Sequence, residues 1–106
     1  MSEAADKTAA LLAKLWVKIQ PIVEERLAIL DRASSAATAG SLSPELRKEA
    51  QNNAHKLAGA LGMYGFDEGT LVARELERLL DTEAPDPVRF SELVRELRTS
   101  VTPQKV

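Results

Sequence analysis

Apolar residues recur along the chain at spacings of three and four, and this spacing limits the possible folds more than any other feature of the sequence. No run of alternating or β-branched residues is typical of a strand. In the middle of the chain, at about 100° per residue, the apolar positions form one stripe on a helix, made of Leu46, Ala50, Ala54, Leu57, Leu61 and Tyr64. The pattern predicts an all-α protein.

Proline, glycine and serine divide this helical pattern into segments. Ser43 before Pro44 and Asp86 before Pro87 match the preference of helix starts for a capping side chain followed by proline. Gly65 suits the left-handed backbone that closes many helices. We therefore predict helices over about residues 4–19, 21–37, 44–65, 67–81 and 87–101.

Short loops favour antiparallel neighbours, so the last four predicted helices form an up-down-up-down four-helix bundle. Pro21 lacks a backbone donor and clashes with the preceding turn, which predicts a break there and an additional N-terminal helix. Residues 1–3 and 102–106 are expected to fray. Outside the middle helix, the side chains expected to face the core are Leu11, Leu12, Leu15, Trp16, Ile19, Ile22, Val23, Leu27, Leu30, Leu71, Leu76, Leu79, Leu80, Phe90, Leu93, Val94, Leu97 and Val101.

Composition fits one globular domain over residues 1–106, of which 44% are hydrophobic and 28% charged. The net charge of −2 argues against nucleic acid as a partner, because phosphate binding needs a basic face. Without cysteine the chain has no disulfide and no thiolate metal site. No apolar run suits a signal peptide or a membrane span. We expect a cytoplasmic monomer without membrane contact, either free-standing or a module of a larger protein.

The single histidine, His55, lies nearly opposite the apolar stripe of its predicted helix. On the same helical wheel Gly59 and Gly62 fall within about 40° of it, so the surface around the imidazole is almost bare of side chains. Each glycine inside a helix costs roughly 0.5–1 kcal/mol relative to alanine. This cost is explained if a second macromolecule has to bring its own reactive atoms up to the ring.

This segment resembles the active helix of histidine-containing phosphotransfer (HPt) domains. The usual lysine of that family is replaced by Ala58, and a lysine stands instead at Lys56. The positions that match the family pattern are His55, Leu57, Gly59, Ala60 and Gly65. The resemblance implies the same helical bundle and a phosphorelay intermediate of two-component signalling, which carries a phosphoryl group on His55 between receiver-domain aspartates.

The resemblance also implies the partners, which are response-regulator receiver domains and a sensor or hybrid histidine kinase. We expect no cofactor on this chain, because the Mg²⁺ ion and the acidic pocket belong to the receiver. The sequence has no phosphate-binding glycine loop of the nucleotide-kinase type, which fits a carrier without kinase activity of its own.

Helical geometry places four polar residues near His55 on its predicted helix. Gln51 and Asn52 lie one turn before His55, where an amide is expected to hydrogen-bond one ring nitrogen. Lys48 lies two turns before it, and Lys56 about 100° to one side, so that either is a candidate cation for the phosphoryl group. Both lysines have a simpler interpretation as solvated surface charges.

Two other classes of function stay open. The first is a helical interaction module that binds receivers or kinases without phosphotransfer, and Ala58 is its chief support. The second is a hydrolase or metal enzyme, which would need convergent catalytic groups. A single histidine and no cysteine argue against a zinc site. The adjacent acids Asp67 and Glu68 stand at a helix start, where the helix dipole favours acidic side chains without any catalytic role.

Overall fold

The computed structural model describes residues 3–101, with side chains from residue 9 onward. This part of the chain folds into four helices and contains no strand. The helices are α1 (Glu3–Thr38), α2 (Pro44–Met63), α3 (Asp67–Leu79) and α4 (Pro87–Val101). Of the tails predicted to fray, residues 1–2 and 102–106 lie outside the described residues, and Glu3 already belongs to α1.

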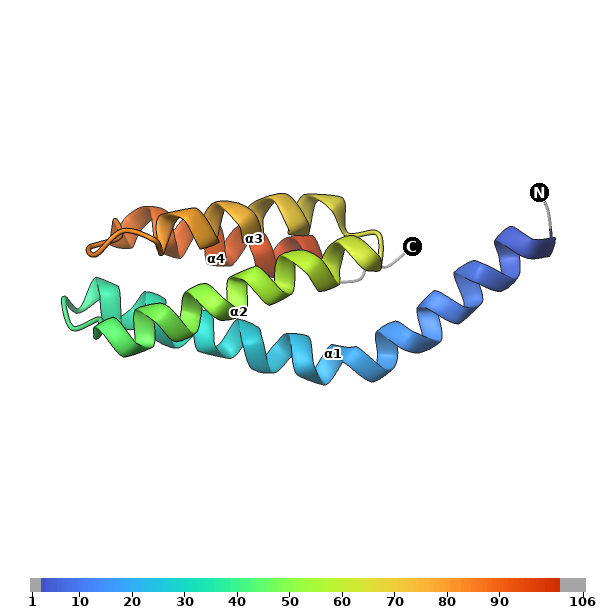
Figure 1. Cartoon of the computed structure of the whole chain (residues 1–106), viewed down its shortest axis with the longest axis horizontal. Coiled ribbons are helices and arrows are strands. Elements are labelled where there is room, and N and C mark those ends of the chain that lie inside the picture. Colours follow the sequence, from blue (N-terminus) through green and yellow to red (C-terminus); the bar gives the residue numbers. More distant parts are fainter. Residues whose placement is uncertain (1–2, 102–106) are drawn as a thin grey trace.

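The helices pack as an antiparallel bundle in which consecutive helices are neighbours. α1 contacts α2, α2 contacts α3, α3 contacts α4, and α4 closes the bundle against α1. Figure 1 shows the C-terminal part of α1 alongside the other three helices, while its N-terminal part extends beyond them. The prediction of an all-α, up-down-up-down four-helix bundle is confirmed.

The predicted break at Pro21 is wrong. α1 runs through this proline as one helix of 36 residues, so the expected additional N-terminal helix is the first part of α1. A proline inside a helix removes one hydrogen bond and bends the helix, and it ends the helix only where nothing else holds the two segments in line. The carbonyl that loses its partner is that of Val17, four residues earlier, and Val17 is 66% exposed, so water can hydrate this carbonyl. Figure 1 shows that α1 is bent rather than interrupted.

An aromatic cluster holds the bent part of α1 against the end of the bundle. The ring of Trp16 lies 5.6 Å from that of Tyr64 and 4.6 Å from that of Phe66, measured between centroids. These are contact distances for tilted aromatic pairs. The cluster joins α1 to the turn between α2 and α3, which is far from Trp16 in sequence.

The core consists largely of the side chains that the periodicity predicted. Those that are buried are Val23, Leu27, Leu30, Ala33, Ala50, Ala54, Leu57, Ala58, Leu61, Ala73, Leu76, Leu80, Phe90, Leu93, Val94, Leu97 and Val101. The predicted inward faces of α2 and α4 are therefore confirmed at their central positions. Burial of these apolar faces is the main stabilising contribution, because each fully buried large aliphatic side chain is worth about 1.5–3 kcal/mol.

Four side chains predicted to face the core are exposed instead. Leu11 and Leu15 are 57% and 40% exposed because they precede the stretch of α1 that the other helices cover. Ile22 follows the bend and is 46% exposed, while its neighbour Val23 is buried. Leu71 is 65% exposed, since it stands five residues, or about 140°, from the buried Leu76.

Both ends of α2 are fixed by the residues that the sequence indicated. The Ser43 hydroxyl oxygen accepts a hydrogen bond from the Leu46 amide at 3.1 Å, and Pro44 occupies the first turn. After the helix Gly65 has a φ of 84°, and the Phe66 amide donates to the Leu61 carbonyl at 2.9 Å. These contacts satisfy backbone groups that a helix end leaves unpaired. They set where α2, the helix that carries His55, begins and ends.

We predict that Ser43→Ala lowers the free energy of unfolding by about 1 kcal/mol, because the Leu46 amide loses its side-chain acceptor. Urea unfolding followed by circular dichroism measures the change. Ser41→Ala is the matched control, since the Ser41 hydroxyl makes only a 3.4 Å exposed contact with the Ala36 carbonyl. An equal loss of stability in both variants would contradict a specific capping role for Ser43.

Candidate phosphotransfer site on α2 and α3

The imidazole of His55 stands in solvent halfway along α2. Its side chain is 72% exposed, as the helical wheel predicted. The opposite face of α2 is anchored in the core by Ala54, Leu57 and Leu61, of which Ala54 directly precedes the histidine and Leu57 follows it by two residues. Rotation of α2 about its axis would withdraw these side chains from the core, so packing on one face fixes the exposure of His55 on the other.

A carboxylate on the neighbouring helix holds one nitrogen of this ring. Nδ1 of His55 lies 2.9 Å from Oε2 of Glu77 on α3, and the Glu77 side chain is half-buried. An ionised carboxylate only accepts hydrogen bonds, so Nδ1 must donate and carries the proton. In the neutral ring the lone pair then lies on Nε2. Within residues 3–101, Nε2 has no hydrogen-bond partner and is available to an incoming group.

Further contacts hold α3 at one register against α2. The Gln51 amide group donates to Oδ1 of Asp81 at 3.1 Å and to the Glu77 carbonyl at 3.3 Å. At the other end the Thr70 hydroxyl donates to the Ala58 carbonyl at 3.1 Å. These hydrogen bonds lie on both sides of the pair formed by His55 and Glu77. They prevent α3 from sliding along α2, which keeps the carboxylate level with the ring.

Neither of the two amide side chains expected to hydrogen-bond the ring does so in the described part of the chain. Gln51 spans from α2 to α3 instead of turning toward His55. Asn52 is exposed and makes no hydrogen bond to the ring in the described part of the chain. Both amides lie at a suitable distance from His55 along α2. However, α3 packs close enough for Glu77 to be the hydrogen-bond partner of Nδ1 instead.

The two glycines near His55 have different surroundings. A Cβ atom added to Gly59 would meet no other atom within 4 Å, so this position faces open space beside the ring. A Cβ atom added to Gly62 would come within 3.2 Å of the Thr70 hydroxyl oxygen on α3. Gly59 thus provides clearance next to His55, as expected, whereas Gly62 allows α2 and α3 to approach closely.

The positive charges beside the ring come mainly from α3. Lys48 and Lys56, the predicted cations, are both exposed and form no ion pair within the described residues. Neither lysine lines the shallow depression that contains the ring. The side chains that line it are His55, Ala58, Gly59, Arg74, Glu77 and Arg78.

Sequence reasoning missed all three charged members of α3 in this depression. Glu77 directly follows the buried Leu76, and Arg74 directly follows the buried Ala73. Such positions beside the apolar stripe of a helix lie at the border of its contact with a neighbouring helix. The positions of Arg74 and Glu77 beside the apolar stripe could be read from the sequence. The helix that they face could not, because it depends on how the helices of the bundle pack against one another.

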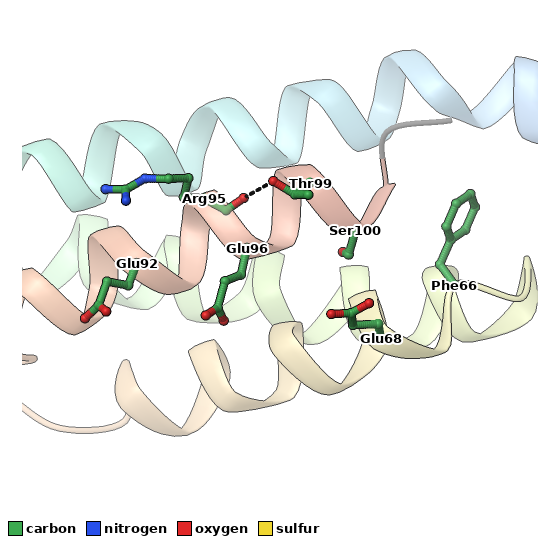
Figure 2. Close-up of a pocket in the computed structure, with 7 residues that line it drawn as sticks. All are labelled: Phe66, Glu68, Glu92, Arg95, Glu96, Thr99 and Ser100. Atoms are coloured by element: carbon green, nitrogen blue, oxygen red, sulfur yellow. Dashed lines mark hydrogen bonds between the residues drawn. The ribbon is translucent and has the colours of Figure 1, made fainter. Parts of the chain in front are cut away.

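A second groove lies between α3 and α4, away from His55. Figure 2 shows the Glu92 and Glu96 side chains extending from α4 toward α3, with Glu68 on α3 and Phe66 at one end. It shares no lining residue with the depression around His55. In the described part of the chain, no group of three or more His, Cys, Asp or Glu residues is arranged to hold a metal ion.

Comparison with known proteins agrees with this geometry. The family model described as "Hpt domain" matches residues 19–102, which is most of the chain, and the chain therefore belongs to the Hpt domain family. Domains of this family are phosphocarrier modules for histidine phosphotransfer in two-component signalling, and they are not kinases. Their partners are other proteins of two-component signalling.

Protein RcaC of Microchaete diplosiphon is a curated relative, 28% identical over 100 residues. The alignment covers 94% of this chain but only 15% of that protein. No solved structure matches the chain. In the described part of the chain, no helix combines the length and apolar character that crossing a membrane requires.

We predict that Glu77→Ala changes the tautomer of the His55 ring, because Nδ1 loses the acceptor that holds its proton. The ¹⁵N chemical shifts of the two ring nitrogens, measured near pH 8, are expected to move from a dominant Nδ1–H form toward a mixture. Glu75→Ala is the control, since it removes a carboxylate of the same helix that pairs with Arg89 and does not contact the ring. Unchanged ring shifts in Glu77→Ala would show that this carboxylate does not set the tautomer.

Proposed function

We propose that this chain is a phosphorelay intermediate that accepts a phosphoryl group on Nε2 of His55 from the aspartyl phosphate of a receiver domain and passes it to another receiver. The observation that carries the proposal is an exposed imidazole whose Nδ1 is engaged by Glu77 and whose Nε2 is open, beside the clear surface at Gly59. Family membership supports the same chemistry.

The step is an in-line exchange between two side chains. The Nε2 lone pair forms the N–P bond while the P–O bond of the aspartyl phosphate breaks, and the electron pair leaves with the receiver's carboxylate. Positive charge develops on the imidazole because Nδ1 keeps its proton. The carboxylate of Glu77, 2.9 Å from Nδ1, stabilises that charge. Transfer to the next receiver reverses the same bond changes.

The receiver supplies what the carrier lacks. Phosphoryl transfer needs alignment and charge stabilisation more than covalent help. In this proposal the Mg²⁺ ion and an acidic pocket stand on the receiver, and the carrier binds no cofactor. A sensor or hybrid histidine kinase stands upstream in the relay, and the carrier acts as a monomer.

We predict that a phosphorylated receiver labels the wild-type chain and does not label His55→Gln, because glutamine has no nucleophilic ring nitrogen at this position. Intact-protein mass spectrometry at neutral to alkaline pH preserves the acid-labile N–P bond and detects the added phosphoryl group. ATP alone is expected to give no label. Several phosphorylated receivers are tested as a panel, because the same measurement identifies the receiver that transfers its phosphoryl group to this chain.

Labelling of His55→Gln to the wild-type extent would contradict the proposal, as would a wild-type chain that no receiver in the panel labels. Circular dichroism of His55→Gln controls for folding, and it is expected to match wild type because the ring is exposed.

Ala58 at the position of the family's lysine favours one other function, a helical module that binds receivers or kinases without phosphotransfer. The two functions differ in their dependence on His55. For the binding module, receiver affinity measured by calorimetry is unaffected by His55→Gln and no label appears on the wild-type chain. For the carrier, the label appears and depends on His55.

We predict opposite effects of Gly59→Gln on stability and on transfer. Replacing this helical glycine raises the free energy of unfolding by roughly 0.5–1 kcal/mol, because the added Cβ meets no atom within 4 Å. Phosphotransfer is expected to slow about tenfold or more, since the longer side chain stands where the receiver must approach; that factor corresponds to about 1.4 kcal/mol in the barrier. Urea unfolding and the rate of label transfer provide the two measurements.

Gly59→Ala is the matched control, because it gives a gain in helix stability at least as large with only a methyl group in the docking space. Its transfer rate is expected to stay within about twofold of wild type. Transfer by Gly59→Gln at the wild-type rate would show that the clear surface at this position does not serve docking.

A further inference from the structure

The lysine that the family carries three residues after its histidine is replaced by Ala58 in this chain, and neither lysine of α2 lines the depression around His55. We propose that Arg74 of α3 takes its place and binds the oxygens of the phosphoryl group on Nε2. This inference rests on the proposed function, because it names the residue that stabilises the phosphoryl group in the same site. Three observations carry it: the register of the two helices, the burial of position 58 and the unpaired state of Arg74.

The register of α2 against α3 brings Arg74 level with Ala58. Contacts between the two antiparallel helices pair Gln51 with Asp81 and His55 with Glu77. Farther along, Gly62 faces Thr70. Each step toward the C-terminus of α2 is matched by an equal step toward the N-terminus of α3, so three residues beyond His55 corresponds to three residues before Glu77. That position on α3 is Arg74.

Position 58 itself is buried where α2 meets α3. Ala58 is only 5% exposed, and its carbonyl accepts a hydrogen bond from the Thr70 hydroxyl. α3 therefore packs against α2 at the position where the family has its lysine. The small side chain of Ala58 allows this close packing, and the same packing brings the exposed Arg74 to the border of the depression around His55.

The guanidinium of Arg74 is available for a ligand. Within the described residues it makes no side-chain hydrogen bond and no ion pair, whereas the guanidinium of Arg47 donates to the Leu80 carbonyl at 2.7 Å and that of Arg89 pairs with Glu75. A phosphoryl group adds about −1.5 to −2 charge and several strong acceptor oxygens. A planar guanidinium can donate two parallel hydrogen bonds to such a group.

Arg78 also lines the depression, but it is less well placed. It follows Glu77 and lies toward the Gln51 end of the contact, on the far side of Glu77 from Gly59. Arg74 lies on the near side, beside the open space through which a receiver reaches Nε2. Lys56 does not line the depression. The geometry therefore assigns the main contact to Arg74.

The test compares Arg74→Gln and Arg74→Lys with wild type after phosphorylation by the same receiver. Two rates are measured: transfer of the phosphoryl group from carrier to receiver, and hydrolysis of the isolated phosphohistidine. Calorimetry with the unphosphorylated receiver gives docking affinity separately. Arg78→Gln and Lys56→Gln remove neighbouring cations, and Arg95→Gln removes an exposed arginine from the distant groove between α3 and α4.

We expect Arg74→Gln to slow transfer about tenfold or more while receiver affinity changes less than about threefold, because the transferring phosphoryl oxygens lose one charge-assisted hydrogen bond in the transition state. The ³¹P shift of the phosphohistidine is expected to move in the same variant. Arg74→Lys restores part of the rate because it keeps the charge. Arg78→Gln and Lys56→Gln are expected to slow transfer less than threefold, and Arg95→Gln leaves it unchanged.

Wild-type transfer and hydrolysis rates in Arg74→Gln would overturn the inference, and so would a larger effect of Arg78→Gln or Lys56→Gln. A rate loss explained wholly by weaker receiver binding would also overturn it, since Arg74 would then serve docking alone. In each of these outcomes His55 is still phosphorylated by the receiver in every variant, so the proposed function would stand. A wild-type chain that no receiver labels is a different outcome, which overturns the proposed function and this inference with it.

Discussion

The contact between α2 and α3 determines the chemistry that His55 can perform. Core packing turns the ring outward, but it leaves open which nitrogen is nucleophilic and which charges surround it. Both are set by the neighbouring helix, through the hydrogen bond from Nδ1 to Glu77. That bond depends on the helix register, which Gln51 fixes on one side of His55 and Thr70 on the other. A shift of α3 by one turn would remove the carboxylate from the ring.

Much of the fold follows from the sequence because its helices are amphipathic and clearly delimited. Ser43, Gly65 and the stripe through Leu57 and Leu61 each act over a few residues, so local patterns reveal them. The error at Pro21 has a different origin. A proline weakens a helix by a roughly known amount, but whether the helix ends there depends on tertiary contacts that no local pattern contains.

The site, like the fold, has features that local sequence patterns predict and features that depend on tertiary contacts. The exposure of His55 and the clearance at Gly59 are properties of one helix, and the spacing of residues on α2 was enough to predict them. The partner of the ring lies 22 residues farther along the chain, on another helix. Predicting Glu77 required the register between α2 and α3, and that register is set by side chains such as Thr70, for which the sequence shows no distinguishing pattern.

In the proposed relay, an open site suits a group that two different receivers have to reach. A residue placed over Nε2 would obstruct docking, so the carrier can only supply groups that stand behind the ring or at its border. Glu77 stands behind it, where its negative charge stabilises the imidazolium without facing the phosphoryl oxygens. Arg74 stands at the border, where a positive charge can reach those oxygens from the side. A second helix can present both charges while the surface of the first stays bare, and in the proposed relay Arg74 would supply the cation that Ala58 does not.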